Sequence, residues 1–432
     1  MKSILFSLCC FSATIINAQT TAYSFLDINQ VKAQVNSGGD LHWNPITGFT
    51  GYEVPIGSNK QWSGPSSLWI GGLDAGGTLH MAAQTYHQSG VDYWAGPLTT
   101  TNATTDSLTV NQYERVWKLN KSDIDNFILN YANGNVQNGS FIPNSNLLQW
   151  PGNGNIAQGQ AINLAPFFDT DGDGIYNPMG AGDYPLIKGD QAVYTIFNDN
   201  YKPHQSTGAL AIGAEIHLMV YAYGTCSVIA NNPFLNYTTF YNYKIINRSS
   251  NSVHMAYVSL FNDSDIGYYG DDKLGSDIKD QYAYTYNSVL AGTDPVVGVA
   301  FLKGPTNTTN GIDDDGDGFI DELNEELGMT NFSYFSNPLP GVPVAMTDPS
   351  VGGDFYKYVS GYWKDGTPLS CGGNGYGAGQ QTTYAFPGDL NSSISTDPNN
   401  ICGNWIEAGS GNDKRFLMSS GPYEMYPGSV TE

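Results

Sequence analysis

The chain of 432 residues is acidic: 40 Asp and Glu residues against 17 Lys and Arg residues give a formal net charge of −23. This charge argues against partners such as nucleic acid and anionic membrane surfaces, because both repel an acidic protein. Only 13% of the residues are charged, whereas 51 Gly and 29 Tyr favour many short strands joined by tight turns.

The first 18 residues have the pattern of a secretory signal peptide. Lys2 provides a positive charge, residues 4–16 are mostly apolar, and the small residue Ala18 precedes Gln19. This apolar run is too short to cross a bilayer, and no later segment has the required length. The sequence therefore predicts a secreted or cell-surface protein that is cleaved between Ala18 and Gln19 and has no transmembrane segment.

Residues 19–165 are expected to form a mixed α/β, loop-rich N-terminal region. Asp27 is placed to cap a first helix and Ser122 to cap a second one, and a hairpin turns at residues 74–77 between them. The predicted elements are a short helix at 26–39, a hairpin at 67–88, a helix at 122–134 and a loop at 133–163.

Residues 166–304 are expected to form an antiparallel β-sandwich domain, so the predicted fold class is mainly β. Apolar side chains alternate with polar or aromatic ones, the period of a strand. Because both faces carry large side chains, a central sheet packed on both sides is the simplest arrangement. The predicted strands are 213–223, 235–247, 253–261, 281–287 and 295–303.

Residues 331–432 form a Gly/Pro-rich region in which only 355–363 resembles a strand, and the chain is expected to continue beyond Glu432. Export permits disulfides. Cys371 and Cys402 are the expected pair, and Cys226 is expected to be a buried thiol.

Residues 169–177 match the D-x-D-x-D-G pattern of a calcium-binding loop. Its predicted ligands are carboxylates at alternate positions, a backbone carbonyl at position seven and polar side chains further on. They are Asp169, Asp171, Asp173, Ile175 (through its carbonyl), Asn177 and Asp183. Gly180 occupies the position where an EF-hand has Glu, and Pro166 and Pro178 exclude its two helices. The pattern therefore predicts a calcium loop outside an EF-hand, against the alternative of an acidic turn without an ion.

A second loop of the same kind is predicted in the segment 305–330, where Gly318 takes the turn and the closing ligand is left open. Its expected ligands are Asp313, Asp315, Asp317, Phe319 (through its carbonyl) and Asp321.

A third acidic stretch, residues 261–277, is less regular. It either binds an ion or forms a solvated acidic turn, and it is also the best place to look for the paired carboxylates of a glycosidase. Its carboxylates are Asp263, Asp265, Asp271, Asp272 and Asp277.

Histidine and tryptophan patterns do not indicate catalysis. There is no H-E-x-x-H motif, nucleophile elbow or phosphate-binding loop, so a structural role is favoured for the histidines, including His217. Four tryptophans could stack on sugars, but core positions are favoured for them in a chain with 13% aromatic residues; they are Trp69, Trp94, Trp150 and Trp363.

Residues 66–98, 164–199, 259–277 and 415–429 resemble stretches of large secreted and cell-surface proteins of Bacteroidota associated with type IX secretion. The resemblance covers most of residues 25–430. It implies an extracellular location, modular β structure and a role in adhesion, with a surface glycan or protein as partner, and it assigns no catalytic residue. The sorting domain typical of such proteins is not found in this chain.

Together these patterns lead to the hypothesis of an exported, calcium-stabilised, non-catalytic β-rich protein of a surface or adhesion type. Two alternatives stay open: an exported hydrolase acting on polysaccharide or protein, and a glycan-binding module.

Overall fold

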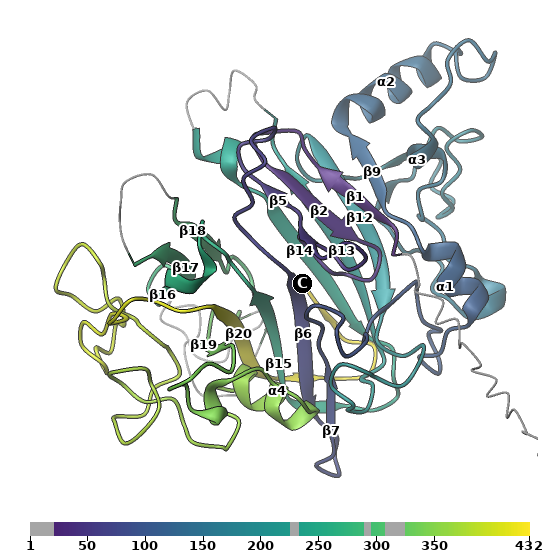
Figure 1. The fold of residues 1–432 in the computed structure, drawn as a ribbon. Helices are drawn as coiled ribbons and strands as arrows, with labels where there is room; N and C mark the ends of the chain where they lie inside the picture. Colours follow the sequence, from purple (N-terminus) through teal and green to yellow (C-terminus); the bar gives the residue numbers. More distant parts are fainter. Residues whose placement is uncertain (1–20, 225–232, 289–294, 307–324) are drawn as a thin grey trace, which may run out of the picture.

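The computed structural model describes four parts of the chain, which are residues 21–224, 233–288, 295–306 and 325–432. The proposed signal peptide, Cys226 and the second acidic loop, with Asp313, Asp315, Asp317, Phe319 and Asp321, lie outside these described residues. The described chain is mainly β with antiparallel sheets, as the sequence predicts (Figure 1). None of the helices in these parts is long and apolar enough to span a bilayer.

The largest sheet has six antiparallel strands. Their order is β21 (Val430–Thr431), β14 (Phe240–Asn247), β13 (Ala214–Ala222), β12 (Gln191–Asn198) and β8 (Trp94–Ala95), with β9 (Trp117–Asn120) also paired to β12. A second sheet has five antiparallel strands. Their order is β19 (Asn331–Ser336), β20 (Lys414–Met425), β15 (Val253–Asn262), β6 (Ser66–Leu73) and β7 (Leu79–Ala82). Both sheets therefore contain strands from inside and from outside the range 166–304, which was expected to form a domain.

Smaller sheets and ribbons surround these two. They are β1 (Tyr23–Leu26), β2 (Lys32–Asn36) and β5 (Tyr52–Glu53); β16 (Asp272–Asp277), β17 (Tyr282–Asn287) and β18 (Val297–Ala300); β3 (Trp43–Asn44) with β4 (Phe49–Thr50); and β10 (Phe167–Phe168) with β11 (Tyr184–Pro185). The helical segments are α1 (Ser107–Tyr113), α2 (Lys121–Ala132), α3 (Ser145–Leu148), α4 (Gly352–Val359) and the 3-10 turns Ile156–Gln158, Pro233–Tyr237, Tyr269–Asp271 and Val344–Met346.

The two large sheets share a hydrophobic core. In β13, Ile216 and Leu218 point into this core with residues of β12 and β14, and it also holds Leu68 of β6 and Val258 of β15. Met219, one position along β13, lies on the opposite face in a cluster with α2 and β9. The alternation seen in the sequence thus separates two cores on the two faces of one sheet, as the period of a strand requires.

Three predicted elements differ from the structure, and one of them is the loop expected at 133–163, which contains α3 and the 3-10 turn Ile156–Gln158. Residues 26–39 were expected to form a helix, but they hold β2, which pairs with β1 with Phe25 opposite Gln34. Residues 355–363 were expected to form a strand, but Gly352–Val359 is the helix α4. The helix at 122–134 is confirmed as α2, although its first turn is capped at Asn120, whose N–H donates to the carboxylate of Asp123 at 3.1 Å.

The predicted hairpin at 67–88 is confirmed by β6 and β7, and the predicted disulfide is confirmed between Cys371 and Cys402, whose Cα atoms are 5.2 Å apart. All four tryptophans considered for sugar stacking are buried, so their core role is confirmed; Trp69, Trp94, Trp150 and Trp363 are 0%, 3%, 4% and 2% exposed.

Candidate metal centre

The first acidic loop is closed by a short antiparallel ribbon. β10 pairs with β11 with Phe168 opposite Tyr184, so residue 169 leaves one strand directly across from residue 183, which enters the other. This register brings Asp183 to Asp169 and Asp171. Each of the three offers an oxygen that lies within 4.8 Å of the other two, so the group could hold a metal ion.

Backbone amides fix the carboxylates of this loop. Asp169 accepts from the N–H groups of Gly172 and Gly174 at 2.8 and 2.7 Å, and both glycines have φ near +77°, which non-glycine residues rarely adopt. Asp183, which is fully buried, accepts from Thr170 and Asn177 at 2.8 and 2.7 Å. The turn therefore forms around the carboxylates and holds them together at one point.

The pKa values of Asp169 and Asp171 shift in opposite directions. The N–H of Gly174 lowers the pKa of Asp169, whereas desolvation and the nearby Asp173 raise the pKa of Asp171. Two carboxylates held this close favour neutralisation, either by a proton or by a cation.

Of the four predicted carboxylate ligands, Asp173 is not in this cluster of three. The carboxylate of Asp173 accepts from the N–H of Ile175 at 2.7 Å, and the side chain of Asn177 accepts from the N–H of Gly180 at 2.9 Å. The structure thus brings together Asp169, Asp171 and Asp183, the last of which the sequence could place only as a carboxylate a few residues further on.

A cavity of about 380 Å³ lies beside the loop and is lined by Asp169, Tyr194, His217 and Lys244. The ring of His217 is fully engaged, with Nδ1 2.7 Å from the Tyr194 hydroxyl and Nε2 2.8 Å from Glu215. Although burial raises the pKa of Glu215, hydrogen bonds from His217 and Arg248 outweigh it and hold this pKa at about 2. Both nitrogens of the His217 ring are therefore held by neighbouring side chains.

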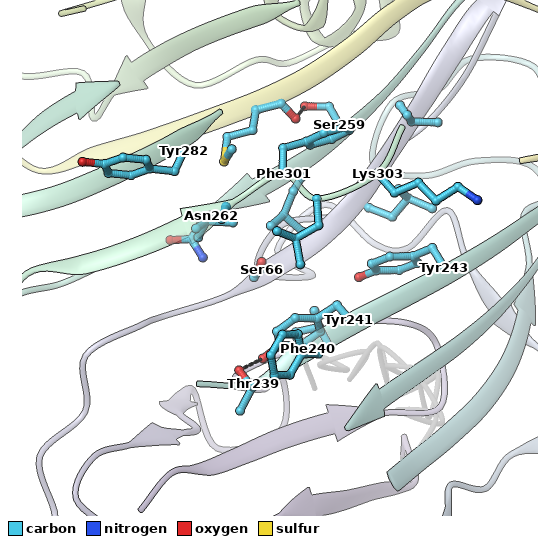
Figure 2. A pocket seen from close by; sticks show the side chains of 18 of the residues that line it. Ser66, Thr239, Phe240, Tyr241, Tyr243, Ser259, Asn262, Tyr282, Phe301 and Lys303 are labelled. Atoms are coloured by element: carbon cyan, nitrogen blue, oxygen red, sulfur yellow. Dashed lines mark hydrogen bonds between the residues drawn. The ribbon is translucent and has the colours of Figure 1, made fainter. Parts of the chain in front are cut away.

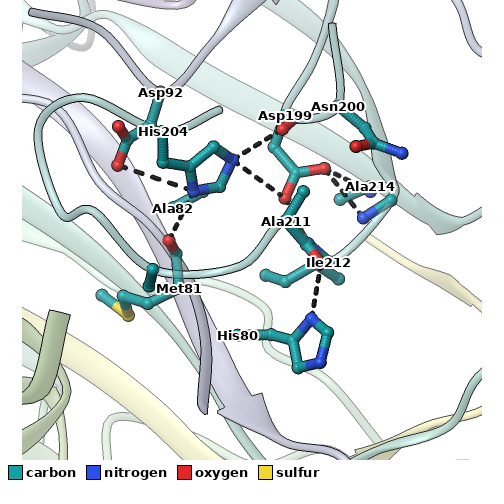
Figure 3. Close-up of polar contacts among 12 residues, drawn as sticks. His80, Met81, Ala82, Asp92, Asp199, Asn200, His204, Ala211, Ile212 and Ala214 are labelled. Atoms are coloured by element: carbon teal, nitrogen blue, oxygen red, sulfur yellow. Dashed lines mark hydrogen bonds and ion pairs between the residues drawn. The ribbon is translucent and has the colours of Figure 1, made fainter. Parts of the chain in front are cut away.

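A second buried polar network surrounds His204 (Figure 3). Its Nδ1 lies 2.8 Å from the carbonyl oxygen of Met81 and 3.8 Å from Asp92, and its Nε2 lies 2.6 Å from the carbonyl oxygen of Asp199 and 3.7 Å from that carboxylate. Carbonyl oxygens only accept, so each ring nitrogen faces an acceptor, and the ring lies between two carboxylates. Desolvation raises the pKa of one of them, Asp199. The side chains of all three residues are 0% exposed.

The third acidic stretch contributes to another cluster. Asp263 and Asp265 lie with Asp413, a residue 150 positions away, and their oxygens all lie within 4.8 Å of one another. Burial raises the pKa of Asp263 to about 7 and that of Asp265 to about 6, with Arg415 opposing the rise. Asp272, at the start of β16, is also buried, and burial raises its pKa to about 8. Asp413 was not a sequence candidate because it stands outside any acidic run.

A larger cavity of about 640 Å³ opens between the two large sheets (Figure 2). Tyr241 and Tyr243 of β14 line it on one side, and Ser259 and Asn262 of β15 line it on the other. His42 lies at its wall, with Nε2 2.7 Å from the Tyr241 hydroxyl and Nδ1 3.3 Å from Ser63.

Burial lowers the pKa of His42 to about 3 from its usual value of 6.5. The folded protein keeps this ring neutral, whereas the unfolded chain takes up a proton below about pH 6.5, so stability is lost as the pH falls from 6.5 towards 3. We expect His42→Gln to remove this dependence. The stability advantage of the wild type over the variant should therefore shrink by about 3 kcal/mol between pH 6.5 and pH 4.

Chemical unfolding of both proteins across this pH range measures the difference, because other titrating groups cancel between them. Tyr241→Phe is the matched control: it removes the hydrogen bond of His42 but keeps the buried ring, so the pH dependence should persist. Parallel stability curves for the wild type and His42→Gln would contradict the assignment.

Comparison with protein-family models, with curated proteins and with solved structures finds no match for this chain.

Proposed function

We propose that this chain is an exported, calcium-stabilised β-rich protein that acts in binding at the cell surface, as an adhesion-type module and not as an enzyme. The observation that carries the proposal is the folded acidic loop, in which Asp169, Asp171 and Asp183 converge. The disulfide between Cys371 and Cys402 supports export, because such bonds persist in oxidising compartments. The resemblance to secreted proteins of Bacteroidota supports the location and type IX export.

Calcium is the proposed ion because the loop offers only hard oxygen ligands. Asp169 is the first and Asp183 the last residue of the loop between β10 and β11, so an ion bound to both would link these two strands. This is a structural role, and the affinity expected for it is that of extracellular modules, on the order of 10⁻⁴ to 10⁻³ M.

A β-sandwich is the proposed arrangement of the two large sheets. Its support is the shared core, to which β13 contributes Leu218 and β15 contributes Val258. A non-catalytic role is supported by the two buried histidines His204 and His217. Both nitrogens of each ring are held by neighbouring protein groups, which fits a role in holding the fold together.

Calcium is expected to stabilise the wild-type protein, and Asp171→Asn is expected to lose the part of this gain that comes from the loop. With a dissociation constant of about 10⁻⁴ M, 10 mM calcium stabilises the folded state by about 2.7 kcal/mol per site. Chemical unfolding of the wild type and the variant, each in calcium and in EDTA, measures the difference. Asp171 is exposed, so its replacement leaves the core intact.

Asp125→Asn is the matched control for this experiment. It removes the same charge from an exposed position that pairs with Lys121 of the same helix, α2, and the full calcium response should remain. An equal calcium response in the wild type and in Asp171→Asn would overturn the assignment of the loop.

A further inference from the structure

Three carboxylates converge where neighbouring strands of the five-stranded sheet end. Asp263 directly follows β15, and Asp413 directly precedes β20. These two strands run antiparallel with Asn262 opposite Phe416, so the end of one lies beside the start of the other. With Asp265, two residues further along, they place carboxylate oxygens within 4.8 Å of one another. We call these three residues the Asp263 cluster.

The Asp263 cluster is buried and holds unsatisfied oxygens. Asp263 is 4% exposed and Asp413 is 8% exposed. One oxygen of each is satisfied, because the Tyr86 hydroxyl donates to Oδ2 of Asp263 at 2.5 Å and the Asn337 amide donates to Oδ2 of Asp413. The other oxygen of each, Oδ1, is buried and accepts no hydrogen bond. A buried carboxylate oxygen without a donor is costly unless another ligand reaches it.

The neighbouring cation does not balance this charge. Arg415 donates through Nε to the Tyr86 hydroxyl at 2.6 Å, and this nitrogen lies 3.6 Å from Oδ1 of Asp263. Its Nη1 lies 3.1 Å from Oδ1 of Asp413 but makes no hydrogen bond. One guanidinium thus faces three carboxylates, and their full ionisation would leave a surplus of negative charge in a desolvated site. A dication would balance this surplus and would reach the two unsatisfied oxygens.

We propose that Asp263, Asp265 and Asp413 bind a divalent cation, and that this cation is calcium. The ligands are all carboxylate oxygens, which suits a hard cation, and calcium tolerates the irregular coordination that a site built from separate strand ends provides. Asp265 is only half-buried and leaves an approach for the ion and its water ligands. The ion would join the ends of β15 and β20, and through Asn337 the end of β19. This site is separate from the loop at Asp169 and does not rest on it.

Calcium titration of the EDTA-treated full chain, followed by calorimetry, tests the site. Asp265→Asn is the principal variant, because Asp265 is half-buried and its replacement keeps the size of the side chain. We expect it to bind one calcium ion fewer than the wild type, or to bind one ion at least tenfold more weakly. Asp280→Asn removes the same charge from an exposed position just beyond this acidic stretch and should bind as the wild type does.

Hydrogen exchange provides a second measurement that needs no substitution in the Asp263 cluster. In an Asp171→Asn background, added calcium should slow exchange at residues 263–272 and 411–415. The loop and the cluster are distinguished by their own variants: a binding change in Asp171→Asn alone supports only the loop, and a change in Asp265→Asn alone supports only the cluster. Unchanged calcium binding in Asp265→Asn, with no calcium-dependent protection of these two segments, would overturn the proposal.

Discussion

Replacing His204 by alanine is expected to lower the free energy of unfolding by about 3–5 kcal/mol, the range found when one partner of a buried ion pair is removed. The imidazole lies between the carboxylates of Asp92 and Asp199, and the side chains of all three residues are 0% exposed. Removing the ring leaves two buried carboxylates without the imidazole that lies between them. It also removes the His204 donor from the carbonyl oxygens of Met81 and Asp199, although the Met81 oxygen keeps the hydroxyl of Thr207 as a donor.

The effect is large because this network joins segments that are distant in the sequence. Asp199 follows β12 and accepts from the backbone N–H groups of Ile212, Gly213 and Ala214 at the start of β13, and Asp92 accepts from Ser206 and Thr207. The carbonyl group of Met81 belongs to β7 in the other large sheet. His204 therefore links β7 of one large sheet to the end of β12 in the other through one buried side chain.

Chemical unfolding monitored by fluorescence measures this change. His254→Ala is the matched control, because that ring pairs with Glu424 at the surface with 41% of its side chain exposed, and we expect a loss below about 1 kcal/mol. If His204→Ala and His254→Ala lose the same stability, the buried network does not carry the energy that its geometry implies.

The wrong predictions for α4 and β2 show that tertiary contacts can override the local sequence pattern. In α4, Phe355, Tyr358 and Val359 are buried at the spacing of one helical face, but the many aromatic residues of this stretch favour a strand by propensity. In β2, Ala33 and Val35 alternate into the core shared by the large sheets, a pattern that the possible cap at Asp27 and the following glycines hide. Packing decided both outcomes.

The candidate sites also differ in how far their residues are separated in the sequence. The loop at Asp169 can be predicted from the sequence because its ligands are close together in the chain. Only the position of Asp183 depends on the pairing of β10 with β11. The Asp263 cluster cannot be predicted from the sequence, because Asp413 is 150 residues from Asp263 and the pairing of β15 with β20 brings the two together. The polar network around His204 likewise depends on three distant segments. The spacing of residues along the sequence predicts a site that is formed by one turn. A site formed by residues from several strands depends on how those strands pair in the sheet.

Removing the disulfide by Cys371→Ser with Cys402→Ser is expected to destabilise the region that it closes by about 3–4 kcal/mol. The bond spans 31 residues, and in the chain-entropy model a closed loop of this size restricts the unfolded chain by that amount. The described residues 360–413, between α4 and β20, form no helix or strand, and Figure 1 shows these loops extending beyond α4 on one side of the molecule. A segment without a hydrogen-bonded ladder depends more strongly on its covalent link.

The loss should be local first. Trp363 and Trp405 anchor the segment from the core by donating their ring N–H groups to the carbonyl oxygens of Gly375 and Gly373, at 2.9 and 3.2 Å. These anchors persist without the disulfide, so the strands of the five-stranded sheet should keep their slow hydrogen exchange while residues 371–402 exchange faster. Hydrogen exchange followed by mass spectrometry separates local opening from global unfolding.

Reduction of the wild type with dithiothreitol supplies the control, because it should reproduce the exchange pattern of the double variant without any substitution. The same reductant should leave the double variant unchanged, since its disulfide is already absent. If exchange at residues 371–402 is equally slow with and without the bond, then the packing of Trp363 and Trp405 alone holds this segment. The covalent link would then contribute little to the stability of the fold.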